Sequence, residues 1–235
     1  MAAFDSTEKN ESGRRERGSI SGEQIIEGAL KLAREVTIEG LSMPKLAQSL
    51  GIGVTSIYWY FRSKEDLLDE LTVAATRQFQ GQMSDFSDLP WPEYMLRHFI
   101  AMHDILTEDD LLCDLLFFRN SKFSVNALEH IWPQIDKTLQ VLVAAGFTEE
   151  EAIHSHFLLS HYTRGCIILW RLIHKAGKTE HIPVRVPATF DVKRFPVLGS
   201  VGEWHSLRGT TPSEFEGGLR IAIEGMKAIV KDRRG

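Results

Sequence analysis

The stretch of sequence that decides the fold is SMPKLAQSLGIGVTSIYWYFRSK, residues 42–64. It contains two short segments with helical apolar spacing, 42–50 and 54–61, separated by the turn Gly51-Ile52-Gly53. Gly51 can adopt the left-handed conformation that ends a helix, so it predicts a sharp turn between two helices. Two short helices held at a fixed angle allow the second to enter the major groove of DNA. We therefore expect 54–61 to be a DNA-recognition helix.

The faces of this helix have different roles. Ile57 and Phe61 are four residues apart and should anchor the helix in the core. The hydroxyl and aromatic side chains on its other faces can reach phosphates, sugars and base edges. Lys64 lies in the first turn of the next helix, where free N–H groups attract phosphate. The predicted DNA contacts, including the start of the preceding helix, are Ser42, Met43, Pro44, Val54, Thr55, Ser56, Tyr58, Tyr60 and Lys64.

The alternative interpretation of this segment is a purely structural corner of three helices. Aromatic residues at helical spacing usually belong to the core, and Trp59 is a candidate for such a position. In that case the protein is a helical small-molecule-binding protein or an enzyme whose N-terminal helices have no contact with DNA.

The N-terminal part of the chain contains one more helix. Ser21 and Gln24 form a capping box that starts it, and Gly40 marks its end and a sharp turn. Residues 1–20 are polar and contain three clustered arginines, so they are expected to form a flexible arm. The other possibility is that this arm reaches phosphates or the minor groove.

The remainder of the chain also has helical patterns and no alternating strand pattern, so the predicted fold class is all-α. Helices are expected over 65–83, 92–106, 109–120, 124–145, 148–176 and 213–231. A capping box of Thr148 and Glu151 opens the longest of them, and a kink is expected at Pro133. Residues 177–212 are rich in Pro and Gly and should be mostly irregular, with a short helix between Phe195 and Trp204.

The DNA-binding segment resembles the TetR family of bacterial regulators. The residues that carry the resemblance are Ser42, Leu46-Ala47, Leu50-Gly51, Ile57-Tyr58, Tyr60-Phe61, Lys64 and Leu67-Leu68. The similarity covers about residues 21–71. The chain departs from the family pattern in two ways that bear on which operator sequence it recognises. Gly53 replaces the Ser or Thr that usually caps the recognition helix. The start of this helix also lacks the Arg, Lys, Gln or Asn side chains that make bidentate base contacts.

The resemblance implies a ligand-responsive transcriptional regulator with three parts: a flexible arm (1–20), a helix-turn-helix domain (21–66) and an effector-binding and dimerisation domain (67–235). It implies a homodimer formed through 149–176 and 213–231, which binds palindromic operator DNA and is released from it by a small lipophilic effector. Aromatic and polar residues of the middle helices are the candidates for effector binding: His98, Met102, Phe117, Trp132, Phe157, His161 and Arg164.

Composition excludes several other classes of protein. A net charge of −5 argues against general polyanion binding, although residues 1–64 carry +1 and the rest −6. Cys113 and Cys166 have no metal-binding spacing and are expected to be free thiols in a reducing cytoplasm. No apolar run is long enough to cross a membrane, so no membrane partner is expected.

Catalytic and metal sites are not expected either. The sequence has no G-x-S-x-G, H-E-x-x-H or Walker motif, so we predict no enzymatic activity, catalytic residue or cofactor. His154 and His156 are two residues apart on a helix and should point in different directions, which makes a shared metal improbable.

Overall fold

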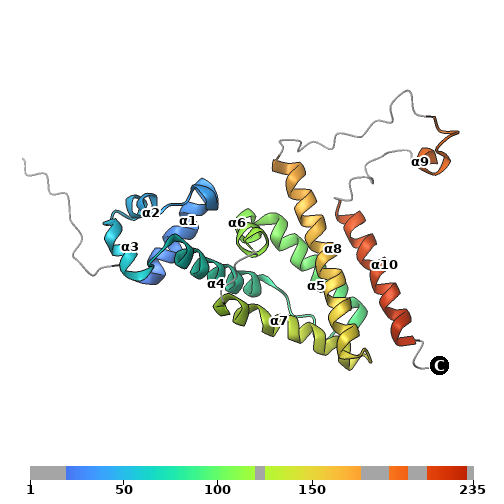
Figure 1. The fold of residues 1–235 in the computed structure, drawn as a ribbon. Helices are drawn as coiled ribbons and strands as arrows, with labels where there is room; N and C mark the ends of the chain where they lie inside the picture. Colours follow the sequence, from blue (N-terminus) through green and yellow to red (C-terminus); the bar gives the residue numbers. More distant parts are fainter. Residues whose placement is uncertain (1–19, 120–124, 176–190, 201–210, 232–235) are drawn as a thin grey trace, which may run out of the picture. The chain divides into compact units, whose positions relative to one another are not determined.

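The computed structural model describes residues 20–119, 125–175, 191–200 and 211–231. Residues 1–19 of the predicted arm, and most of the predicted loop at 177–212, lie outside these ranges. Every regular element within them is a helix, which confirms the all-α prediction (Figure 1). The chain divides into two compact units, Met1–Leu71 and Thr72–Gly235. In the described ranges, no helix combines the length and the apolar character that crossing a membrane requires.

The first unit contains α1 (Gly22–Gly40), α2 (Met43–Leu50), α3 (Val54–Tyr60) and the beginning of α4 (Lys64–Gln82). The predicted capping box is present: Gln24 N–H donates to Ser21 Oγ at 3.2 Å, and Ser21 N–H donates to Gln24 Oε1 at 2.9 Å. Gly51 ends α2 with φ +67°, the left-handed conformation expected from the sequence. The unit's core contains Ile25, Ala29, Leu46, Ile57, Phe61 and Leu67.

Helix α1 ends at Gly40, as predicted, but the sharp turn does not lie there. Positive φ occurs at Thr37 (φ +64°), not at Gly40, so the backbone turns three residues earlier than expected. Gly40 has a different role, because a Cβ at this position would lie 3.3 Å from Val36 Cβ. The glycine therefore permits a close approach rather than a left-handed turn.

The second unit contains the rest of α4, then α5 (Trp91–Glu108), α6 (Asp110–Cys113), the π-helix η1 (Asp114–Phe118), α7 (Val125–Ala144), α8 (Glu149–Lys175), α9 (Pro196–Ser200) and α10 (Pro212–Lys231). Helices α5, α8 and α10 pack together (Figure 1). The capping box of Thr148 and Glu151 is confirmed. The α10 residues that face the core are Phe215, Leu219, Ile223, Met226 and Val230.

The segment 109–120 was expected to be one helix; its described part is helical from Asp110 to Phe118, but it is not a single α-helix. A single turn of α6 passes directly into the π-helix η1. The buried guanidinium of Arg171, on α8, holds both parts: it donates to the carbonyl oxygen of Asp110 at 3.1 Å and pairs with Asp114 at 2.7 Å. These partners lie about 60 residues from Arg171 in the sequence, so local periodicity cannot reveal them.

Gly218 provides a test of the packing between α8 and α10. A Cβ at this position would lie 1.9 Å from the Tyr162 hydroxyl oxygen, while the Tyr162 ring stacks on Phe215. We expect Gly218→Ala to displace Tyr162 and to lower the free energy of unfolding by about 1–3 kcal/mol. Gly81→Ala is the control, because a Cβ at Gly81 meets nothing within 4 Å. Urea unfolding of both variants checks this, and equal stability would contradict it.

Candidate DNA-binding surface and ligand cavity

The recognition helix α3 presents the residues expected from the sequence. Ile57 and Phe61 are buried, as predicted. The predicted contact residues of α3 are all exposed: Val54, Thr55, Ser56, Tyr58 and Tyr60. Gly53 caps the helix without a side-chain hydrogen bond. The hydroxyl and aromatic groups of α3 are therefore accessible to a duplex, although their contact with DNA stays a prediction.

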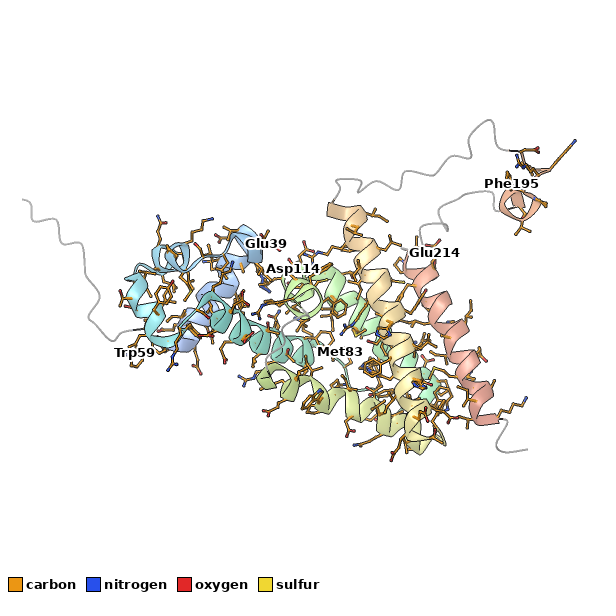
Figure 2. All side chains as sticks on the ribbon, viewed as in Figure 1. Glu39, Trp59, Met83, Asp114, Phe195 and Glu214 are labelled. Carbon is orange, nitrogen blue, oxygen red and sulfur yellow. The ribbon has the colours of Figure 1, made fainter. Side chains whose placement is uncertain are left out.

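Two expectations about this surface need correction. Met43 is only 4% exposed, because the first residue of α2 directs its side chain into the core, so that side chain cannot contact DNA. Of its neighbours, Pro44 is exposed and Ser42 caps α2 by accepting from Lys45 N–H at 3.4 Å. Trp59, considered for the core, is 80% exposed (Figure 2).

Lys64 and Tyr60 also make contacts that the sequence did not suggest. The Lys64 ammonium donates to the carbonyl oxygens of Ile38 (3.0 Å) and Glu39 (3.5 Å), at the end of α1. The Tyr60 hydroxyl donates to the carbonyl oxygen of Ile20 at 2.8 Å. Both side chains thus connect elements of the first unit, and a phosphate would have to compete with these carbonyls for Lys64.

Two further residues belong among the candidates. Trp59 offers a large ring to sugars or bases, and its ring lies edge-on to Tyr60 at 4.8 Å between centroids. Arg62 is exposed directly after α3, where a guanidinium can bind phosphate. Its position between the recognition helix and Lys64 could have identified Arg62 as a candidate from the sequence alone.

A separate cavity of about 320 Å³ lies inside the second unit. Helices α4, α5, α7 and α8, together with η1, contribute its walls. Its walls are mostly apolar and aromatic, which is typical of pockets for small organic ligands. The described lining residues are Thr76, Phe79, Gln80, His98, Phe99, Met102, Leu106, Leu116, Phe117, Leu128, Ile131, Trp132, Gln134, Ile135, His156, Phe157, Ser160 and Arg164.

The cavity brings together six of the seven residues predicted to bind an effector: His98, Met102, Phe117, Trp132, Phe157 and Arg164. His161 is the exception, because it is exposed on α8 and stacks on Phe157 with 5.9 Å between centroids. His156 was considered only as a metal ligand, yet it lines the cavity, whereas His154 is exposed on another face of α8. The i, i+4, i+8 spacing of His156, Ser160 and Arg164 could have revealed this shared face.

Two buried histidines lie at the cavity wall. His98 is 5% exposed, and its pKa is lowered to about 4 by burial, with smaller contributions from His156 and Lys137. His156 is 6% exposed, and burial followed by the charge of Arg164 lowers its pKa to about 4. Both imidazoles are therefore neutral at pH 7. Among the described residues, His156 Nδ1 has no hydrogen-bond partner.

Arg164 is the cationic group of the cavity wall. Its guanidinium lies over the Phe117 ring, 4.7 Å from the centroid, and its buried Nε has no hydrogen-bond partner among the described residues. Burial lowers its pKa, although an arginine remains charged. The cavity therefore combines an apolar body with a positive charge that has no acidic partner in the described part of the chain.

Comparison with known proteins identifies the family to which the chain belongs. The family model "Bacterial regulatory proteins, tetR family" matches residues 25–71, and "Tetracyclin repressor-like, C-terminal domain" matches residues 114–230. An HTH-type transcriptional repressor of Mycobacterium tuberculosis is 34% identical over 221 residues, which cover 93% of this chain and 84% of the relative. The chain belongs to the TetR family. It is thus a ligand-responsive, DNA-binding transcriptional regulator with a helix-turn-helix segment.

Other TetR-family members are also similar to this chain. The class A tetracycline repressor protein of Escherichia coli is 27% identical, and the match covers 90% of this chain and 94% of the repressor. The crystal structure of TetR from Acinetobacter baumannii has a TM-score of 0.61 at 21% identity, covering 90% of this chain and 98% of that one. ActR of Streptomyces coelicolor, in complex with (S)-DNPA, has a TM-score of 0.60 at 19% identity, with the same coverage. At these identities the two structures support the fold.

Proposed function

We propose that this protein is a homodimeric repressor that binds a palindromic operator and releases it when a small, largely apolar effector occupies the cavity of the second unit. The relative in Mycobacterium tuberculosis is named a repressor, which supports this direction of control. We further propose that the protein acts in the cytoplasm, has no membrane partner and has no catalytic activity.

The observation that carries this proposal is the course of α4. This helix begins at Lys64, directly after the recognition helix, and its Thr76, Phe79 and Gln80 form part of the cavity wall. A ligand that moves these residues acts on the same continuous helix that leads to the DNA-binding segment. A hundredfold preference of the ligand for the released conformation supplies roughly 2.7 kcal/mol of coupling.

The dimer surface proposed for α8 and α10 rests on their exposed apolar residues. Within one protomer, Leu172 is 63% exposed and Ile221 is 77% exposed, which is unusual for such side chains in well-packed helices. Gly165 and Gly225 have open space beside them, so another helix can approach these positions closely. The remaining exposed apolar residues of the two helices are Ile153, Phe157, Leu158, Ile168, Leu169 and Ile229. A two-fold dimer would place its recognition helices about 34–36 Å apart, in successive major grooves.

The test of DNA binding is a gel shift with the DNA upstream of the protein's own gene. The wild type should form a specific complex that weakens steeply as salt rises. Tyr58→Ala and Trp59→Ala should each reduce operator affinity about tenfold, because each removes a ring from the exposed side of α3. If neither substitution weakens the complex, the proposed contact of α3 with DNA is contradicted.

A matched control uses an aromatic residue away from α3. Phe195 is exposed near α9, and Phe195→Ala should leave the operator affinity unchanged. The effector is then sought by a thermal-shift screen of apolar compounds, followed by the same gel shift. A compound that stabilises the protein and dissociates the complex supports repression, whereas one that strengthens the complex overturns the proposed direction of control.

A further inference from the structure

We propose that the effector is an organic acid whose carboxylate is bound between Arg164 and His156, with its apolar body among the aromatic residues of the cavity. This rests on the proposed function, because it names the chemical class of ligand for the same site. Three features of the cavity wall lead to it.

The first feature is the placement of the polar groups. His156, Ser160 and Arg164 follow one another at intervals of four residues on α8, and all three line the cavity. Residues four apart lie on the same face of a helix, so the three side chains form one polar row in a mostly apolar wall. A ligand with one polar end and one apolar body matches this arrangement.

The second feature is the charge. Arg164 carries a positive charge, and no Asp or Glu is among the described residues that line the cavity. Arg164 is partly buried, and its Nε has lost contact with water without gaining a hydrogen-bond partner among the described residues, which is unfavourable. A ligand carboxylate would supply the missing charge and a bidentate hydrogen-bond acceptor.

The third feature is the set of free hydrogen-bonding atoms. Two other polar groups of the wall are used internally: Thr76 donates to the Thr72 carbonyl oxygen, and Gln80 donates to the His130 carbonyl oxygen. By contrast, Arg164 Nε and His156 Nδ1 are buried and have no partner among the described residues. A neutral imidazole can carry its proton on Nδ1 and donate it to an anion, so the same face of α8 offers two free donors.

The test compares acids with neutral amides of the same shape, using full-length protein. The probes are 2-naphthoic acid, 4-phenylbutanoic acid and decanoic acid, each paired with its primary amide, and titration calorimetry gives the affinities at pH 7.5. At least one acid should bind tenfold or more tightly than its amide. A lack of preference in all three pairs, including a lack of binding, overturns the proposal.

Substitutions then locate the binding site. Arg164→Met should remove the preference for the acid, and His156→Gln should weaken acid binding at least threefold. His154→Gln, on another face of α8, is the control and should bind as the wild type does. Arg164→Met should also raise Tm of the ligand-free protein by about 2–4 °C, because it removes a partly buried charge that has no carboxylate partner among the described lining residues. If Arg164 had only a structural role, Arg164→Met would have a lower Tm than the wild type. If Arg164→Met still prefers the acid to the amide, Arg164 is not the residue that binds the carboxylate.

The gel shift separates this inference from the proposed function. An acid that binds through Arg164 without releasing operator DNA supports the anion site and contradicts effector-controlled repression. A neutral compound that releases DNA equally well from the wild type and from Arg164→Met supports repression and overturns the anion site.

Discussion

Leu172→Glu should convert the protein into a folded monomer that has lost most of its affinity for operator DNA. Leu172 is 63% exposed in the protomer, so a glutamate there meets water in the monomer and leaves the core intact. In the proposed dimer the same carboxylate would be buried without a partner, which opposes association by several kcal/mol. Ile221→Glu, at a position 77% exposed on α10, should act in the same way.

The effect on DNA follows from the two-fold arrangement. In a dimer, binding of one half-site raises the effective concentration of the second recognition helix, a gain of about 10²–10⁴ in affinity that monomers lack. Sedimentation measures the oligomeric state and a gel shift measures the affinity. Gln82→Glu introduces the same charge at an exposed position of α4 and should remain dimeric. A dimer retained in both Leu172→Glu and Ile221→Glu would refute this interface.

Patterns within a few neighbouring residues were sufficient to predict most of the helices. The capping boxes at Ser21 and Thr148, the left-handed Gly51 and the buried row of α10 depend on residues within one or two helical turns, so the sequence shows them directly. Even the start of α10 followed a local signal that had been missed, because Thr211 and Glu214 form a third capping box.

Several of the wrong or missing predictions concern contacts between distant segments. Arg171 binds Asp110 of α6 and Asp114 of the π-helix, Lys64 binds carbonyl groups of α1, and Met43 is covered by the first unit's core. None of these partners can be identified from spacing along the chain. For the cavity, aromatic helices were a correct guide to its position, but His161 was chosen in place of His156, although His156 shares a helix face with Arg164 and is the buried one of the two.

Acidification from pH 6.5 to pH 4 should destabilise the protein strongly, and the two cavity histidines should account for much of this loss. In the unfolded chain a histidine titrates near pH 6.5, whereas burial lowers the pKa of both His98 and His156 to about 4. Between these values the unfolded state binds more protons than the folded state, so the free energy of unfolding falls as the pH falls. Each histidine can contribute about 2–3 kcal/mol at the acidic end.

Variants of two histidines on α8, His156 and His154, separate this effect from general acid denaturation. His156→Gln removes one buried titrating group, so its free energy of unfolding should decrease less between pH 6.5 and pH 4 than that of the wild type. His154→Gln is matched in chemistry and helix but alters an exposed side chain, and should keep the wild-type slope. Urea unfolding at several pH values measures all three proteins. If the free energy of unfolding changes with pH equally in His156→Gln and in the wild type, His156 is protonated in the folded state as readily as in the unfolded chain. The buried, neutral imidazole inferred for this side of the cavity would then be wrong.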